Sequence, residues 1–402
     1  MGEITEATGP GDSAAFEQVV SELLEATHRV HPEHLVPLFT KQIARLGMLD
    51  AVVYIVDVDQ RLLVPLGGGV PLVIDSTLGG RSFRSEVVLD GAADEDGPAT
   101  NRRRLWVPIV DGAERVGVLA VTVDGPRDQV LDRVRALASL LAMLIVAKLP
   151  YGDALVCARR LRPMDLAAEL RWDILPPLTY VNSRVAISGI LEPAYEIAGD
   201  SFDYALNGDV AHLAILDAMG HGLEASRIAN VTVGAYRNAR RSGADLLGTF
   251  RAMDEVVPSQ FGPDKFVTGH FATMDMTTGR MRVVNAGHPL PILLRGHAVV
   301  DIDLRPSLPI GVGGIPPTVE DLSLEPGDTI LFFTDGVTEA RSPDGDEFGR
   351  TRLTDLLVRT AAGETVAEVA RKLCHAVLEH QGGRLQDDAT LLLLTWPGPL
   401  PE

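Results

Sequence analysis

The sequence is poor in cysteine, with only Cys157 and Cys374 among 402 residues. The two lie far apart and neither belongs to a Cys-x-x-Cys pair, which argues against a disulfide framework or a zinc knot and favours a reducing compartment. Positive charge is also scarce, because 36 Lys and Arg against 55 Asp and Glu give a net charge of −19. Nucleic acid and anionic membranes are therefore disfavoured as partners, whereas an anionic substrate stays open if metal ions supply the positive charge.

Long apolar runs are missing as well. The longest, residues 136–147, is shorter than the ~20 residues that a membrane-spanning helix needs and is better interpreted as a buried helix. The N-terminus is acidic and lacks the apolar centre of a signal peptide. We therefore expect a cytoplasmic protein that binds neither membrane nor nucleic acid.

A chain of this length predicts two or three domains. Residues 1–30 are expected to form a tail and a helix. Residues 31–149 combine helical patterns with strands, including a strand pair, 104–110 and 115–124, around a turn at Asp111-Gly112. This order of elements resembles a GAF-type sensor domain of α/β architecture, with a PAS-like domain as the alternative. Such a domain would bind a small molecule or a protein partner, or would only dimerise.

Residues 150–178 are predicted to form a helical linker. Apolar residues recur there with broken helical spacing, Pro163 divides the stripe, and Pro176-Pro177 ends it. Helices that join a sensor to an effector commonly pair across a dimer, so a homodimer is a further expectation.

Residues 179–398 show a different sequence pattern, in which short apolar segments typical of strands alternate with turns. Amphipathic helices follow Gly222, Ala244 and Thr365, and the last of them begins with a capping box of Thr365 and Glu368. Runs of strands separated by helices predict an α+β fold, with a β-sandwich inside and helices outside. The expected strands are 184–190, 210–216, 266–276, 280–286, 291–294, 329–334 and 389–396.

Four acidic positions in this region share one pattern, since each carboxylate adjoins an apolar strand near a glycine or a turn. They are Asp200 in AGDSFD, Asp217 in LAILDAMGHG, Asp335 in TILFFTDG, and Asp387-Asp388 before ATLLLL. Strand ends at one edge of a sandwich can bring such residues together. Carboxylates so placed would repel one another without cations, and an all-oxygen ligand set favours Mg²⁺ or Mn²⁺ over zinc. Two such ions ~4 Å apart can activate a water for attack on phosphorus.

Each of these residues alone has a simpler interpretation. A single Asp after a strand is usually a turn residue or a helix cap, so Asp217 alone could cap the helix after Gly222. His221 and His288 are, as histidines in loops, more often structural than catalytic. Only the occurrence of several motifs in one order favours a shared site.

That ordered series of motifs carries a resemblance. The segments are LEPAYEIAGDSFD, LAILDAMGHGLEAS, FVTGHFATMDMTTGRMRVVNAGHPLP, LEPGDTILFFTDGVTEA and LQDDATLLLL. Together they resemble the SpoIIE/RsbU branch of the PPM (type 2C) metal-dependent serine/threonine phosphatases, over residues ~170–396.

The resemblance implies a PPM-type β-sandwich and particular residue roles. Asp217 would bridge two metal ions, Mn²⁺ or Mg²⁺, and Asp200 would contact the first ion or orient its water, so this pair would be catalytic. The implied metal ligands are Asp200, Asp217, the carbonyl of Ala218, Asp335 and Asp387. Whether Asp387 or its neighbour Asp388 is the ligand stays open, as do the roles of the two histidines.

The resemblance also implies an activity. We expect hydrolysis of phosphoserine or phosphothreonine on a regulatory protein, which in that family is an anti-anti-sigma factor, under control of the N-terminal domain. Before the domain the family usually reads Gln…LLP, whereas this chain has Arg171 and Ile174-Leu175-Pro176. The alternatives are a catalytically silent binding module of the same fold, in a sigma-factor partner-switching pathway, and another phosphoryl-transfer enzyme such as a nucleotide cyclase.

Overall fold

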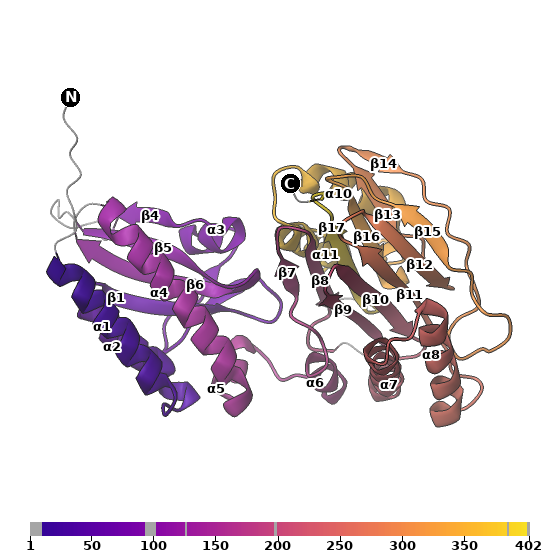
Figure 1. Ribbon diagram of the computed structural model, residues 1–402, viewed down its shortest axis with the longest axis horizontal. Helices are drawn as coiled ribbons and strands as arrows, with labels where there is room; N and C mark the ends of the chain where they lie inside the picture. Colours follow the sequence, from indigo (N-terminus) through magenta and orange to yellow (C-terminus); the bar gives the residue numbers. More distant parts are fainter. Residues whose placement is uncertain (1–9, 93–101, 125–126, 197–198, 384–385, 400–402) are drawn as a thin grey trace. The chain divides into compact units, whose positions relative to one another are not determined.

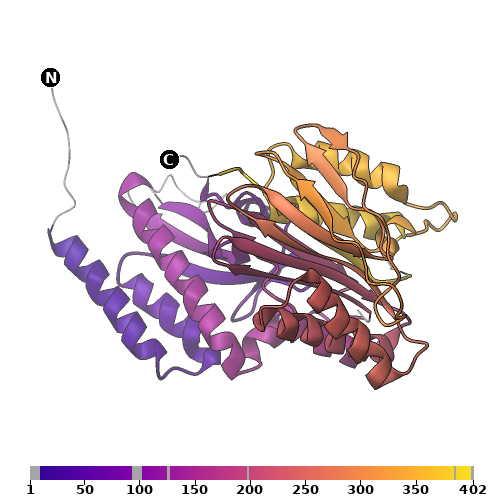
Figure 2. The ribbon, with the colours of Figure 1, turned by 45° about the vertical axis from the view of Figure 1, so that its right-hand side comes forward.

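The computed structural model describes residues 10–92, 102–124, 127–196, 199–383 and 386–399 (Figures 1 and 2). The chain divides into two compact units, Met1–Leu161 and Arg162–Glu402. The predicted linker is shared between them, because its first helix belongs to the N-terminal unit and its second to the C-terminal unit. No helix in the described ranges is both long and apolar enough to cross a membrane.

The described residues of the N-terminal unit form a six-stranded antiparallel sheet with the order β3-β2-β1-β6-β5-β4. The strands are β1 (Leu49–Val56), β2 (Leu62–Pro65), β3 (Leu72–Val73), β4 (Leu89–Ala92), β5 (Arg102–Asp111) and β6 (Glu114–Asp124). The α-helices are α1 (Pro10–Thr27), α2 (Leu35–Ala44), α3 (Leu78–Ser85), α4 (Arg127–Lys148) and α5 (Ala154–Arg159), with 3-10 turns at Pro32–His34 and Leu149–Tyr151.

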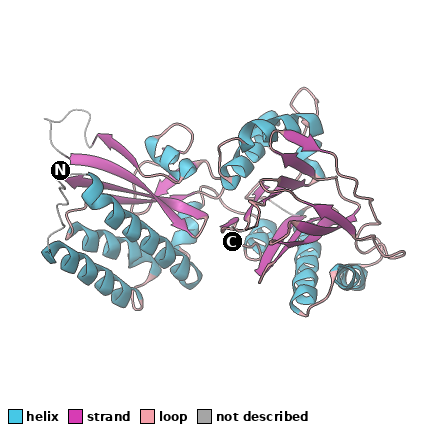
Figure 3. Cartoon of the chain, turned by 45° about the horizontal axis from the view of Figure 1, so that its top comes forward, coloured by secondary structure: helices cyan, strands magenta, loops and turns pink. Residues whose placement is uncertain are grey.

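Helices cover both faces of this sheet (Figures 1 and 3). The apolar residues of α1, α2 and α4, such as Leu23, Phe39 and Leu141, pack on one face, and Phe83 of α3 packs on the other. The central strand β6 is consequently buried along nearly its whole length. This mixed α and β architecture agrees with the expected fold class, whereas the assignment to the GAF family stays a prediction.

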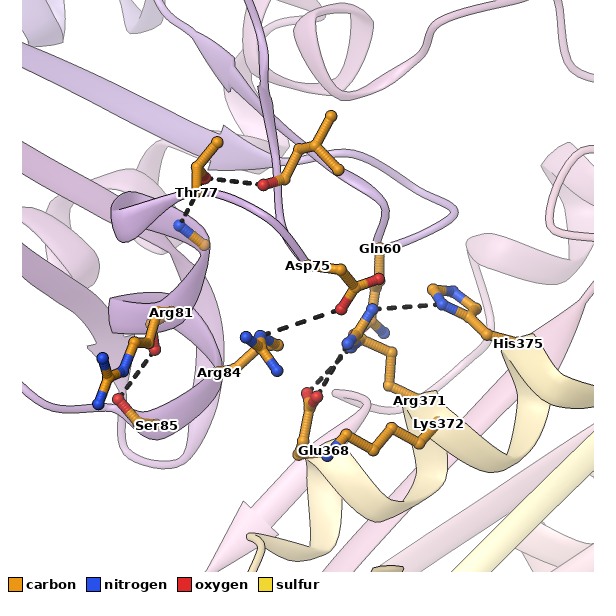
Figure 4. Close-up of polar contacts among 12 residues, drawn as sticks. Gln60, Asp75, Thr77, Arg81, Arg84, Ser85, Glu368, Arg371, Lys372 and His375 are labelled. Atoms are coloured by element: carbon orange, nitrogen blue, oxygen red, sulfur yellow. Dashed lines mark hydrogen bonds and ion pairs between the residues drawn. The ribbon is translucent and has the colours of Figure 1, made fainter. Parts of the chain in front are cut away.

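The predicted strand pair around Asp111-Gly112 is confirmed as β5 and β6. Helix α3 was not predicted, because its sequence LGGRSFRS contains two glycines that favour a loop reading. Gly80 is required there for packing, since an added Cβ would overlap the backbone of Ile74. Thr77 caps the helix by accepting a hydrogen bond from the Gly80 amide at 3.1 Å (Figure 4).

The C-terminal unit is a sandwich of two antiparallel sheets. In the described residues the orders are β15-β12-β11-β10-β9 and β14-β13-β16-β17-β8-β7. The first sheet comprises β9 (Asp200–Asn207), β10 (Val210–Ala218), β11 (Val267–Asp275), β12 (Arg280–Ala286) and β15 (Glu320–Ser323). The second comprises β7 (Thr179–Val181), β8 (Ala186–Glu192), β13 (Ile292–Arg295), β14 (Ala298–Val300), β16 (Thr329–Phe333) and β17 (Ala389–Thr395).

Helices flank the sandwich on both outer faces, as predicted (Figure 3). α7 (Gly222–Arg241) and α8 (Leu246–Phe261) pack on the first sheet, and α10 (Gly349–Ala361) and α11 (Val366–His380) pack on the second. The remaining helices are α6 (Leu166–Trp172), beside α7, and the single turn α9 (Asp335–Thr338). The N-cap half of the predicted capping box is present on α11, where Thr365 accepts a hydrogen bond from the Glu368 amide at 3.3 Å.

The middle of α11 carries a charged group of its own (Figure 4). Both side-chain nitrogens of Arg371 that face Glu368 donate to its carboxylate, at 2.9 and 2.8 Å, and Arg371 Nη1 lies 3.2 Å from His375 Nδ1. Spacings of three and four residues place these side chains on one side of the helix.

The segment that contains AGDSFD was not among the expected strands. Residues 200–207 form β9, which pairs with β10 along its whole length. Asp200, Ser201 and Asp203 are polar residues that favour turns, and burial on both faces of the strand overrides this local preference.

Candidate functional site

Polar residues gather at one end of the inner faces of the sandwich. Side chains alternate between faces along a strand, so Leu213 and Ile215 of β10 point into the inner core and Asp217 continues the same face. The same alternation places Phe332 of β16 in the inner core, and Thr334, which directly follows β16, continues the same face. The apolar core thus ends in a polar layer at this edge.

Asp217 lies at the centre of that edge. Its Cα pairs with Asp200 on β9 and with Thr268 on β11. Burial, and after it the charges of the nearby carboxylates Asp335, Asp387 and Asp388, together raise the pKa of the Asp217 carboxyl to about 7. Four of the predicted acidic positions are therefore brought within electrostatic reach of one another.

Asp200 is the most buried of the set, at 2 % exposure. Burial raises its pKa well above the usual value, and the charges of Asp217 and Asp388 act in the same direction. Its Oδ2 accepts a hydrogen bond from Thr334 Oγ1 at 2.7 Å, and that hydroxyl in turn accepts one from the amide of Thr390 at 3.0 Å. The two threonines were not predicted as site residues, although the two-residue alternation of β16 and β17 would have found them.

Asp335 and Asp387 form the outer part of the site. Asp335 begins α9, and its pKa is raised by burial and by the charge of Asp387. Asp387 is exposed, and its Oδ1 accepts a hydrogen bond from the amide of Asp388 at 2.9 Å. Glycine is required at position 336 for the start of α9 to approach Asp388 so closely, because an added Cβ there would overlap the carbonyl oxygen of Asp388.

Ala218 presents its carbonyl oxygen next to Gly199. An added Cβ at Gly199 would overlap that oxygen, and the Ala218 amide donates to the carbonyl of Gly199 at 3.2 Å. The following turn contains Gly220 and Gly222, both in the left-handed region with φ of 97° and 69°. Glycine is thus required both beside the Ala218 carbonyl and in the turn that leads into α7.

Asp388 has a different role from Asp387. Its Oδ2 accepts hydrogen bonds from the amides of Gly199 at 2.7 Å and Asp200 at 3.2 Å. The Asp388 side chain is therefore engaged with the backbone at the start of β9, whereas Asp387 is exposed.

The two histidines lie in different environments. His221 is exposed at the N-cap position of α7 and its side chain makes no capping hydrogen bond. His288 is buried, its Nδ1 lies 2.9 Å from Thr268 Oγ1, and burial lowers its pKa to about 3. His270, which was not singled out in the sequence, packs edge-to-face on His288 with ring centroids 5.2 Å apart.

The donor set suits hard divalent cations. In the described part of the chain no three side chains of His, Cys, Asp or Glu converge closely enough to enclose a metal ion. Mg²⁺ and Mn²⁺ sites do not require this, because such ions keep several waters and can be held by one or two carboxylates. The raised pKa values of the clustered carboxyls give the physical reason for a cation here, since a cation favours their ionised forms.

Comparison with known proteins shows similarity to one family and to several of its relatives. The family described as "Stage II sporulation protein E (SpoIIE)" matches residues 207–397. Protein IcfG of Synechocystis is 27% identical over 266 residues, which cover 57% of this chain and 40% of IcfG. Phosphoserine phosphatase RsbU of Bacillus subtilis is 23% identical over 234 residues, which cover 58% of this chain and 69% of RsbU.

One solved structure is similar over part of the chain. The RsbU and RsbW domains of Rv1364c from Mycobacterium tuberculosis align with a TM-score of 0.48 and 26% identity, over 54% of this chain and 61% of that chain. This chain thus spans well under half of IcfG and less than two thirds of the Rv1364c structure. 

The C-terminal unit is a phosphatase domain of the PP2C (PPM) type. Residues 207–397 match the SpoIIE family, and the similarity to RsbU covers 58% of this chain. The resemblance first noted in the sequence motifs is confirmed for this part of the chain.

Proposed function

We propose that this chain is a metal-dependent phosphatase that removes phosphate from phosphoserine or phosphothreonine of a regulatory protein. The observation that carries the proposal is that Asp217, Asp335 and Asp387 lie at one edge of the sandwich within electrostatic reach of one another. A fold can keep mutually repelling carboxylates so close together when bound cations offset their repulsion.

Four groups would hold the ions: Asp217, Asp335 and Asp387 would supply carboxylate oxygens, and Ala218 would supply a backbone carbonyl. The buried Asp200, opposite Asp217 on β9, would orient the water that the ions bind. When bound, two divalent ions such as Mn²⁺ or Mg²⁺ would activate a water and neutralise charge on the phosphoryl group. The chain's own residues orient this site, because Thr334 fixes Asp200 and Gly199 allows the Ala218 carbonyl to approach.

The partner is proposed from the relationship to RsbU, whose name describes a phosphoserine phosphatase. We infer a phosphorylated anti-anti-sigma-type protein as the substrate of this chain. The net charge of −19 is compatible with a phosphorylated substrate only if the site itself is positive, which again requires the ions.

The N-terminal unit is proposed to regulate this activity. It contains a cavity of about 560 Å³ between α2, the β1–β2 hairpin and α5, lined by apolar residues that include Val36, Leu66 and Leu155. Cavities of this size and character bind small molecules in many proteins. A compound that binds there should raise the melting temperature of the protein and change its phosphatase rate.

The test is Mn²⁺-dependent release of phosphate from an aryl phosphate and from phosphoproteins. Asp217→Asn should lower the rate at least ~100-fold, because a carboxylate that would hold the ions is lost. Asp321→Asn, on the exposed edge strand β15, is the matched control and should retain the wild-type rate. Undiminished turnover by Asp217→Asn would exclude the assignment, and metal binding without hydrolysis would favour a silent binding module.

A further inference from the structure

Within the C-terminal unit, helix α6 is fixed to α7 and to the residues that follow β8 by hydrogen bonds. Ser226 of α7 donates from its hydroxyl to the carbonyl of Ala167 at 3.1 Å, and Asn230 donates to the carbonyl of Leu170 at 3.4 Å. At the end of α6, the Trp172 indole donates to the carbonyl of Ala194 at 2.8 Å. The position of α6 relative to the sandwich is therefore well defined.

Helix α6 carries a buried arginine, Arg171, whose charge interacts with the acidic residues at the edge of the sandwich. Arg171 has no exposed surface, and its Nη2 lies 3.4 Å from the carbonyl oxygen of Ser226. Burial lowers the pKa of the guanidinium to about 10, while the charges of Asp200 and Asp388 act to raise it. Arg171 therefore remains charged at neutral pH, and a buried charge needs nearby opposite charges of this kind.

The two carboxylates near Arg171 are those most engaged with the protein itself. Asp388 Oδ2 accepts from the amides of Gly199 and Asp200, and Asp200 Oδ2 accepts from Thr334. Gly199 in turn lies against the carbonyl oxygen of Ala218. A continuous series of contacts thus runs from Asp388, through the start of β9, to the backbone oxygen of the proposed metal site.

We propose that Arg171 is a positioning residue of the metal site, which acts by neutralising Asp388 and thereby holding the Gly199–Asp200 backbone against Ala218. The inference rests on the proposed function, because it assigns a role within that metal site. It divides the acidic cluster into two parts: Asp200 and Asp388 are balanced by the guanidinium, and Asp217, Asp335 and Asp387 are left for the ions. Asp387, not Asp388, is then the metal ligand of the pair.

The test is a calorimetric titration of the metal-free full-length chain with MnCl₂. Arg171→Gln should weaken the apparent Mn²⁺ affinity by ~10–100-fold, as loss of a group that orients metal ligands typically does. Arg171→Lys keeps the charge but lacks the planar fork of donors, so it should restore part of this loss. Asp388→Asn should resemble Arg171→Gln, and the double variant should be no worse than either alone.

The matched control is Arg240→Gln. Arg240 is also a largely buried arginine of the C-terminal unit, but it pairs with Asp203 at 2.8 Å on the helix-facing side of β9. Its loss should lower the melting temperature and leave Mn²⁺ affinity unchanged. A merely structural role for Arg171 would give the same outcome as this control.

Three outcomes would overturn the inference. One is an Mn²⁺ affinity of Asp388→Asn within about twofold of wild type, a measurement that still decides if Arg171→Gln does not fold. The second is additive losses in the double variant. The third is no rescue by lysine. If the wild-type chain binds Mn²⁺ normally but releases no phosphate, the proposed function fails while this titration still decides the role of Arg171.

Discussion

Asp217 and Asp200 lie directly opposite each other on the neighbouring antiparallel strands β10 and β9. Both carboxyls have raised pKa values, in each case first because of burial and then because of neighbouring carboxylates. Like charges on opposite residues of paired strands destabilise a sheet. This pair therefore weakens the metal-free fold at the position where the proposed ions would bind.

The first prediction concerns pH and metal. The pKa of Asp217 is raised to about 7 in the folded protein from 3.8, so the folded state binds the proton more tightly than the unfolded state does. Its contribution to stability is present below pH ~4 and is lost as the pH rises through ~7. The metal-free protein should consequently lose on the order of 2 kcal/mol of unfolding free energy between pH 5 and pH 7.5.

The unfolding free energy of the metal-free protein is measured by urea denaturation in a chelating buffer at pH 5 and pH 7.5. Asp217→Asn should reduce the pH dependence, and saturating Mn²⁺ should remove most of it from the wild-type protein. Equal pH slopes for the wild type and the variant would contradict the assignment of the effect to Asp217.

The second prediction concerns Gly199. Gly199→Ala would force its new methyl group against the carbonyl oxygen of Ala218, so β9 and β10 must separate locally. We expect ~10-fold or greater loss of Mn²⁺ affinity, together with lower activity. Gly234→Ala is the matched control, because Gly234 lies within α7 with open space around it, and it should stabilise the protein by up to ~1 kcal/mol. Normal metal binding by Gly199→Ala would show that the Ala218 carbonyl is not a ligand.

The third prediction concerns Thr334. Its hydroxyl donates to Asp200 at 2.7 Å and accepts from the Thr390 amide at 3.0 Å. Thr334→Val has nearly the same shape but leaves both partners unsatisfied, so it should cost ~1–3 kcal/mol in unfolding free energy and weaken Mn²⁺ binding. Thr334→Ser keeps the hydroxyl and should retain metal affinity. Urea denaturation and metal titration of the two variants separate the hydrogen bonds from the packing.

The fourth prediction concerns the start of the phosphatase domain. The predicted boundary at residue 179 would remove residues whose backbone is bound by the sandwich and its helices. Tyr204 donates to the carbonyl of Pro177 at 2.7 Å, and Arg237 bridges Asp203 and the carbonyl of Ile174. A fragment of residues 162–402 should therefore melt at a clearly higher temperature than one of residues 179–402. Equal melting temperatures would show that α6 contributes nothing to this unit.

Local sequence patterns were sufficient for the apolar strands and for the identity of the acidic residues. Short apolar runs marked β10, β16 and β17, and the motifs in their order identified the phosphatase domain. Patterns with glycine or several polar residues misled, as in α3 and β9, because packing against other segments decides such cases.

The sequence by itself determined which carboxylates adjoin apolar strands, because a strand and the residue that follows it are consecutive in the chain. Only the tertiary structure decided how neighbours such as Asp387 and Asp388 differ. Asp388 binds the amides of Gly199 and Asp200, almost two hundred positions earlier in the chain, and it lies near the buried Arg171 of α6. Contacts between residues so distant in sequence leave no local pattern, because they arise only when the strands and α6 are packed together.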